Sequence, residues 1–440
     1  MLNTKIARRI GGALLVAGIA ASTASCSARA PYTDSTPVTI NFWHGWSLPS
    51  DVAALDANIA KFQKLHPNIT VKTTPNVSDD KLLQGLRTAN GPDVVSSFTT
   101  NSVGALCQGA LADLNPLLEK DGIDKQSVFI KTRIDYTQYQ GKQCTLPFLG
   151  DAVGLYYDKA AFAAAGITTP PVTWSEFSAD AVALTHRSGG TYATLGFMPS
   201  FQGYESDVGT WMHQWSPKYF DAAGKSALAT DPVVSEFFTY TASLVKDLGG
   251  YAALQDYRSG FGEEFSAENP FEVGKVAMAF DGEWRIALLA NNASKIDYGV
   301  APLPVPDDQR DSYGKGYLTG TVIGLSSRSA HQEAAWELVK YLATDTDAMV
   351  SFGNAIQNLP STTAALESPD LTAGPAFKTF LDISSNPGSG GVPASSNGGE
   401  YLNILTRFAN SWESGEATDL AAGLADVDTQ VDAANAQSAG

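Results

Sequence analysis

Aromatic side chains and carboxylates follow two predicted strands of this 440-residue chain. Trp46 comes just after an alternating segment at residues 38–43, and Asp281 and Trp284 follow an apolar run at residues 276–280. Flat aromatic rings cover apolar surfaces, whereas carboxylates accept hydrogen bonds from hydroxyl groups. The combination is therefore suited to a small molecule that has apolar C–H faces edged with hydroxyl groups.

Sequence motifs of the common hydrolases and phosphate-binding enzymes are missing. The sequence has no GxSxG or HExxH motif, and Gly224-Lys225-Ser226 lacks the upstream glycine of a phosphate loop. The five histidines are scattered without metal-ligand spacing, so we expect neither a metal nor another cofactor. A glycosidase remains an alternative, because the separation of two carboxylates cannot be read from a sequence. A structural or adhesive protein is a third alternative. We expect a binding protein and not an enzyme.

The charge of the chain excludes one class of partner. With 29 Lys and Arg against 46 Asp and Glu, the formal net charge is −17. Such a surface repels nucleic-acid phosphates, and no basic stretch with interleaved aromatic residues interrupts it. We therefore do not expect binding to nucleic acid.

The N-terminus has the pattern of an export signal. A basic stretch that ends at Arg9 is followed by an apolar run at residues 10–21, which is too short to span a bilayer, and by small residues before Cys26. The pattern resembles a bacterial lipoprotein signal, by the general secretory or the twin-arginine route. We expect residues 1–25 to be the signal peptide, Cys26 the lipidation site and residues 26–37 a tether. Plain secretion without a lipid is the alternative.

Two further cysteines, Cys107 and Cys144, lie in the expected exported part. An even number of cysteines in an oxidising compartment is compatible with a disulfide. Two buried thiols are equally compatible with the sequence.

Alternating strand and helix patterns predict an α/β fold. Predicted strands at residues 38–43, 69–73 and 93–95 are separated by two amphipathic helices, which favours parallel βαβ units. Further strands are expected at residues 276–280 and 321–325. Thr173 and Glu176 have the spacing of a capping box at the start of a helix. The aromatic-rich stretch from Tyr192 to Phe265 is expected to be helical. The length of the chain favours two lobes.

Several longer motifs follow one another in order over about residues 38 to 360. They are INFWHGW (40–46), GPDV (91–94), GALADLNPLL (109–118), LPFLGDAVGLYYDKAAFAAAG (146–166), FEVGKVAMAFDGEW (271–284), GTVIGL (320–325) and EAAWELVKYL (333–342). Together they resemble the extracellular solute-binding proteins of ABC sugar importers, a family that includes the maltose-binding and glycerol-3-phosphate-binding proteins.

The resemblance implies a periplasmic-binding-protein-like type II fold, in which two α/β lobes surround a hinge and a ligand cleft. It implies lobe 1 at residues 38–146 plus 303–355 and lobe 2 at residues 147–302 plus 356–440. It also implies a monomer that captures a carbohydrate and delivers it to the transmembrane subunits of an ABC permease, driven by a cytoplasmic ATPase. With the lipid anchor, we expect the protein at the outer face of the cytoplasmic membrane.

The expected ligand is a mono- or disaccharide, with an amino sugar among the candidates. A glycerol-3-phosphate or glycerophosphodiester ligand is the alternative, although the chain has Glu400 and Tyr401 where that branch of the family places an arginine. His44 is equally compatible with a structural role. The candidate ligand-binding residues are Trp43, His44, Trp46, Ser97, Asp151, Tyr204, Asp281, Trp284, Gly316, Tyr317, Thr321 and Tyr401.

Overall fold

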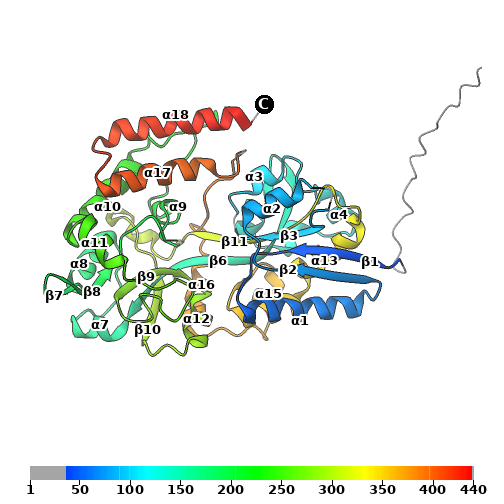
Figure 1. Ribbon diagram of the computed structural model, residues 1–440, viewed down its shortest axis with the longest axis horizontal. Helices are drawn as coiled ribbons and strands as arrows, with labels where there is room; N and C mark the ends of the chain where they lie inside the picture. Colours follow the sequence, from blue (N-terminus) through cyan, green and yellow to red (C-terminus); the bar gives the residue numbers. More distant parts are fainter. Residues whose placement is uncertain (1–35, 89, 99, 204, 396, 439–440) are drawn as a thin grey trace, which may run out of the picture.

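The computed structural model describes residues 36–438, except positions 89, 99, 204 and 396. The predicted signal peptide, the lipidation site Cys26 and nearly all of the tether lie outside the described residues. Two groups of helices occupy the two ends of a long central sheet, which gives two lobes side by side (Figure 1). Ten strands form this sheet, and its main path has the order β2-β1-β3-β11-β6-β9-β8-β7.

Lobe 1 is built on three parallel strands, as the sequence predicts. The central strand β1 (Val38–Trp43) pairs in parallel with β2 (Ile69–Thr74) and β3 (Val94–Ser97). Helix α1 (Pro49–Leu65) starts with a proline at its first position and buries Leu55, Ile59 and Phe62 against the sheet. The other helices of this lobe that are used below are α2 (Asp79–Leu86), α3 (Val103–Leu106), α6 (Lys131–Ile134), α13 (Gln332–Thr344) and α14 (Thr346–Ile356), with the 3₁₀ helix η1 (Asp135–Thr137).

Three strands connect the lobes near the middle of the sheet. The 14-residue strand β6 (Thr145–Asp158) runs through both halves (Figure 1). Strand β11 (Leu318–Leu325) pairs antiparallel with β3 and β6, and the short β12 (Leu359–Pro360) pairs with β6 at Leu149 and Gly150. A ligand cavity beside these strands would therefore be lined from both lobes. The exact lobe boundaries given above remain a prediction.

Lobe 2 has a mixed sheet covered by helices. Its strands are β7 (His186–Ser188), β8 (Thr191–Phe197), β9 (Val276–Gly282) and β10 (Tyr298–Pro302). The expectation of a helical stretch from Tyr192 was wrong at its start, because strand β8 lies there and its residues Leu195 and Phe197 pair in parallel with β9. The capping box is confirmed: Thr173 and Glu176 make both of its hydrogen bonds at the start of helix α8 (Trp174–Ala183).

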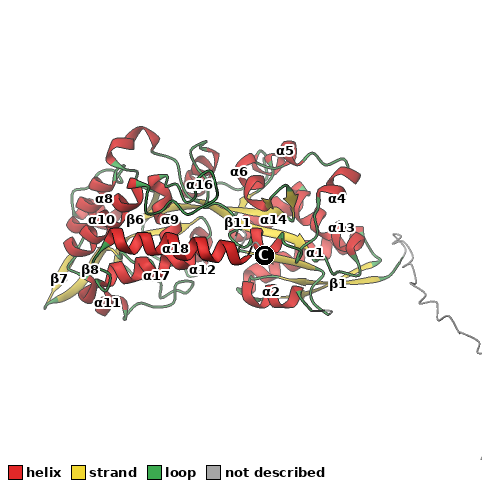
Figure 2. Cartoon of the chain, turned by 90° about the horizontal axis from the view of Figure 1, so that it is seen from above, coloured by secondary structure: helices red, strands yellow, loops and turns green. Residues whose placement is uncertain are grey.

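Long helices complete lobe 2 on one side. Helices α17 (Glu400–Ser414) and α18 (Leu420–Ser438) lie side by side above the lobe, next to α10 (Pro232–Asp247) (Figures 1 and 2). Two shorter helices, α12 (Arg285–Asn291) and α16 (Pro375–Ser385), flank the sheet. Within residues 36–438, no helix combines the length and the apolar character that crossing a bilayer requires.

Cys107 and Cys144 form a disulfide whose Cα atoms are 5.3 Å apart. It joins the end of α3 to the residue that precedes β6. Both cysteines are almost completely buried in a small apolar cluster of lobe 1. The bond therefore fixes the peripheral α3 segment to the strand that enters lobe 2.

Candidate functional site

A cavity of about 280 Å³ is lined by residues of both lobes. Four aromatic side chains form much of its wall, two from lobe 1 and two from lobe 2. Its volume is near the lower end of the range of small-molecule sites. The lining residues are Gly45, Trp46, Ser47, Leu48, Asp51, Phe98, Asp151, Phe265, Trp284, Ala287, Leu288, Asn291, Thr321, Ile356 and Asn358.

The wall from lobe 1 is centred on Trp46, which follows β1. Its ring meets Phe98, Phe148 and Phe352 edge-on, with ring centroids 5.2, 5.6 and 5.1 Å away. Edge-to-face pairs at these distances are favourable, and they hold the indole in one orientation. Trp46 is 5% exposed, so it presents only a small part of its surface to the cavity.

The wall from lobe 2 is one face of helix α12. Trp284, Ala287, Leu288 and Asn291 are spaced three and four residues apart, so they lie on the same side of the helix. The ring of Trp284 passes over Gly282, where a Cβ atom would lie only 2.2 Å from the ring. Glycine at this position therefore makes room for the indole.

Polar groups of the cavity are mainly carboxylates and amides. Asp51 lies in the first turn of α1, and burial raises its pKa. Asp151 on β6 accepts a hydrogen bond of 2.6 Å from the side-chain amide of Asn358, and burial raises its pKa to about 6. The residues that line this cavity include no lysine, arginine or histidine. Among the described residues, the lining therefore offers no cation that could balance an anionic ligand.

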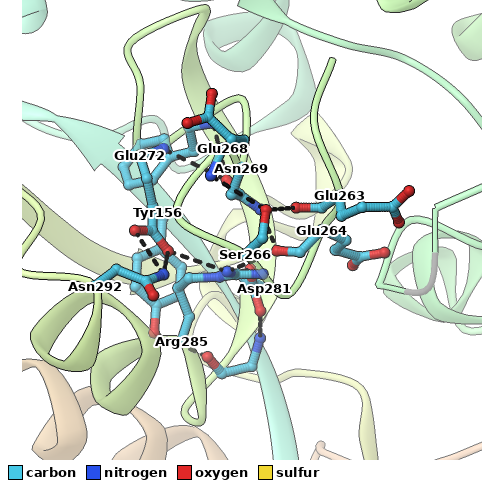
Figure 3. Close-up of polar contacts among 12 residues, drawn as sticks. Tyr156, Glu263, Glu264, Ser266, Glu268, Asn269, Glu272, Asp281, Arg285 and Asn292 are labelled. Carbon is cyan, nitrogen blue, oxygen red and sulfur yellow. Dashed lines mark hydrogen bonds and ion pairs between the residues drawn. The ribbon is translucent and has the colours of Figure 1, made fainter. Parts of the chain in front are cut away.

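Asp281 is part of an ion-pair network behind this wall (Figure 3). Its carboxylate pairs with Arg285 at 2.5 Å, and Arg285 also reaches the carbonyl oxygen of Glu264 and the carboxylate of Glu272. The guanidinium carbon of Arg285 lies 5.9 Å from the ring centre of Phe265. Asp281 does not line the cavity but supports the helix and the loop that do.

The candidates near β1 and β3 divide between cavity and core. His44 is fully buried between Phe42 and Trp46, with ring centroids 5.4 and 5.6 Å away, and burial lowers its pKa to about 4. Trp43 packs over Gly85. The hydroxyl of Ser97 donates to Asp79 at 2.8 Å. None of these three candidates lines the cavity.

The candidates from later in the chain lie mostly in the core of lobe 2. Gly316 packs against Ile383, and the ring of Tyr317 meets His213 edge-on at 5.7 Å. The hydroxyl of Tyr401 donates to the carbonyl oxygen of Pro393 at 2.7 Å. Tyr204 lies outside the described residues. The candidates that do line the cavity are Trp46, Asp151, Trp284 and Thr321.

Sequence reasoning missed most of the other lining residues. Phe98 comes directly after β3, so the argument from strand ends could have found it. Asn291 lies on the same helical face as Trp284, and helical spacing was a usable signal for it. Asp51, Phe265 and Asn358 carry no such signal, because they reach the site from a helix start, a loop and the residue before β12. Within the part of the chain that the structure describes, no group of three or more His, Cys, Asp and Glu side chains could hold a metal ion.

Comparison with known proteins agrees with this architecture. The family model described as "Bacterial extracellular solute-binding protein" matches residues 45–349. A putative binding protein of Brucella abortus is 30% identical over 217 residues, which are 49% of this chain and 50% of that protein. The chain thus spans about half the length of the first curated relatives that it matches. The maltotriose-binding protein of Pyrococcus abyssi is 20% identical over 77% of this chain and 70% of its own length.

Solved structures have the same fold. CpMnBP1 with mannobiose bound superimposes with a TM-score of 0.79 at 23% identity, covering 90% of this chain and 100% of that one. The GacH receptor of Streptomyces glaucescens superimposes with a TM-score of 0.70 at 20% identity, covering 90% and 98%. Both are sugar-binding or receptor proteins of the type II architecture, which establishes the expected fold of two lobes around a cleft.

Proposed function

Because this chain belongs to the bacterial extracellular solute-binding protein family, we propose that it captures a small carbohydrate and delivers it to an ATP-driven importer. The observation that carries the proposal is the cavity lined by Trp46 and Phe98 from one lobe and by Trp284 and Phe265 from the other. Aromatic planes on two sides can cover the apolar faces of sugar rings. Asp51, Asp151 and the two asparagine amides supply partners for hydroxyl groups.

A neutral or cationic saccharide fits this site better than a phosphate ester. Phosphate groups are usually bound by arginine, lysine or a helix N-terminus. The lining contains two aspartates and none of the basic side chains. The sn-glycerol-3-phosphate-binding periplasmic protein of Yersinia pestis is 22% identical over 341 residues, which keeps such a ligand as the alternative. An amino sugar would suit the two carboxylates.

The remaining parts of the proposal concern location and partners. We infer export followed by lipidation at Cys26, so that the protein stays at the outer face of the cytoplasmic membrane. There the monomer would present its closed, loaded form to the transmembrane subunits of a permease with a cytoplasmic ATPase. Mass spectrometry of the mature N-terminus tests the anchor: a diacylglycerol on Cys26 is expected, and an unmodified mature N-terminus would contradict it.

A thermal-shift screen tests the ligand class. Mannobiose, mannotriose, maltotriose, glucosamine and glycerol-3-phosphate are added separately, and the melting temperature and tryptophan fluorescence are recorded. A ligand that binds only the folded protein raises the melting temperature, and it changes the emission of Trp46 or Trp284 by removing water. We expect a response to at least one sugar. A response to glycerol-3-phosphate alone would support the alternative ligand class.

A tryptophan substitution tests the site itself. Trp284→Ala removes the aromatic wall of α12 and is expected to weaken sugar binding more than tenfold, which corresponds to about 1.4 kcal/mol. The matched control is Trp412→Phe in α17, because Trp412 does not line the cavity. Its indole N–H donates a hydrogen bond to the carbonyl oxygen of Phe238 instead. Unchanged affinity of the Trp284 variant would show that this cavity is not where the sugar binds.

A further inference from the structure

A buried pair of carboxyl groups connects the cavity to the strands that join the lobes. Asp151 lines the cavity and is 6% exposed, whereas Glu283 directly follows β9 and is fully buried. The side-chain nitrogen of Asn358 donates to both of them, at 2.6 Å to Asp151 Oδ1 and at 3.0 Å to Glu283 Oε1. One amide group thus bridges the two carboxyls.

Main-chain groups fix the buried member of this pair. The N–H of Ala152 on β6 donates to Glu283 Oε2 at 3.0 Å, and the N–H of Leu359 on β12 donates to Oε1 at 3.4 Å. Glu283 therefore ties together the end of β9 and two of the strands that run between the lobes. Asp151 lies on β6 as well, so both carboxyl groups stand where strands join the lobes.

The charges around the pair do not balance if both carboxyls are ionised. Arg133 on α6 is 1% exposed, and its positive charge acts on both of them. Its guanidinium already donates to the carbonyl oxygen of Pro360 and, at 2.6 Å, to the hydroxyl of Ser384. Two carboxylates beside one guanidinium leave one excess negative charge in a largely buried cluster, which is costly.

The other titratable groups near the pair do not compensate for this charge. Tyr136 in η1 faces the same cluster as a neutral phenol, since burial raises its pKa far above neutral pH. Asp51 lines the same cavity and adds no positive charge. Burial raises the pKa of Glu283 well above its ordinary value and that of Asp151 to about 6.

We propose that Asp151 and Glu283 share one proton at neutral pH, and that the pair takes up a second proton from solvent when a neutral ligand fills the cavity. A ligand replaces the water next to Asp151, and loss of water disfavours the charged form of a carboxyl group. The protonated Asp151 then donates a hydrogen bond to an oxygen atom of the ligand. This inference rests on the proposed sugar-binding function, because it concerns the same cavity.

Proton uptake makes ligand affinity depend on pH in one direction. The complex holds more protons than the free protein, so the dissociation constant rises with pH above about 6. Uptake of one full proton changes it by at most about tenfold per pH unit. A cationic ligand would instead favour the ionised Asp151, and its binding would release a proton.

Titration calorimetry with mannobiose, mannotriose and maltotriose tests the proposal. Titrations at pH 6.5 in two buffers of different ionisation enthalpy should give different heats, with the sign of proton uptake. Asp151→Asn mimics the protonated acid and can neither gain nor lose a proton. It should lose both the buffer dependence and the pH dependence. Asp180→Asn is the matched control, because burial also raises the pKa of Asp180 to about 6 although it does not line the cavity, and this variant should keep both dependences. Equal heats in the two buffers, or proton release on binding a neutral sugar, would overturn the proposal.

A measurement without ligand separates this inference from the proposed function. If none of the three sugars binds, the sugar assignment fails, but the shared proton can still be observed. Infrared spectroscopy at pH 7.5 should show the C=O stretch of a protonated carboxylic acid that disappears in Glu283→Gln. Other buried acids, such as Glu205, contribute equally to both spectra and cancel in the difference. A difference spectrum without this band would refute the shared proton.

Discussion

Arg285 Nε lies 2.5 Å from Asp281 Oδ2, four residues earlier in the chain, and both side chains are almost entirely buried. The pair holds the start of α12 to the end of β9, directly behind the cavity wall that carries Trp284. Its importance is therefore structural, although Asp281 occupies the strand-end position expected of a ligand contact.

Removing one partner of this pair should destabilise the protein. Asp281→Ala leaves the guanidinium of Arg285 buried with a weaker set of partners, so we expect the free energy of unfolding to fall by about 3–5 kcal/mol. Urea denaturation measures the change. The control is Asp382→Ala, which breaks the ion pair with Lys378 at the same spacing but on the surface, and costs less than about 1 kcal/mol. Similar losses in the two variants would contradict this account.

The close approach of Trp284 to Gly282 gives a second prediction. Gly282→Ala should displace the indole, because the added Cβ atom would lie 2.2 Å from it, and should weaken sugar binding severalfold without touching the ligand. Gly85→Ala is the matched control, since its Cβ atom would lie 2.3 Å from the ring of Trp43, which does not line the cavity. Calorimetry with a bound sugar should separate the two variants. Equal affinities would show that the position of Trp284 is unimportant.

The burial of His44 predicts a loss of stability in acid. Burial lowers its pKa to about 4, from 6.5 in the unfolded chain, so the unfolded state binds the proton first as pH falls. The contribution of neutral His44 to the free energy of unfolding is therefore fully present above pH 6.5. It decreases towards pH 4, by up to about 3 kcal/mol. His44→Phe should lose less stability than the wild type over this range. Burial also lowers the pKa of His213, and its contribution to the acid loss is the same in both proteins. Parallel pH profiles from urea denaturation would count against this role.

The disulfide predicts that reduction lowers the free energy of unfolding. Cys107 and Cys144 are 37 residues apart, and a loop of this length gives about 3–4 kcal/mol on the chain-entropy model. The double variant Cys107→Ser, Cys144→Ser should unfold at a correspondingly lower urea concentration. Reducing the wild type should lower its stability by a similar amount and leave the double variant unaffected. A wild type insensitive to reductant would contradict the prediction.

The sequence predicted the strands of lobe 1 because their apolar patterns are short, regular and bounded by turn residues. Strand β8 was missed because Thr191–Phe197 contains aromatic and small residues that suit a helix as well as a strand. Its pairing with β9 depends on a partner about 80 residues later in the chain, and a local pattern does not contain that information.

The candidate site was predicted only in part, for reasons of geometry. Trp46 and Trp284 were found because ligands meet the ends of strands in open α/β sheets. Nearby His44 was included by the same argument, although it faces the apolar core. Asn358 could not be found, because β12 brings it next to Asp151, more than 200 residues away in the chain. Sequence indicates the type of side chain but not which side of a loop faces the ligand.

Direct titration of the purified protein with sugars, followed by recovery of the ligand, tests the central claim. Calorimetry should give saturable binding of one sugar molecule per protein, and mass spectrometry should recover that sugar intact after prolonged incubation. Absence of binding heat across mannobiose, mannotriose, maltotriose and glucosamine would contradict the claim that the cavity captures a carbohydrate. Recovery of cleaved sugar would instead identify an enzyme.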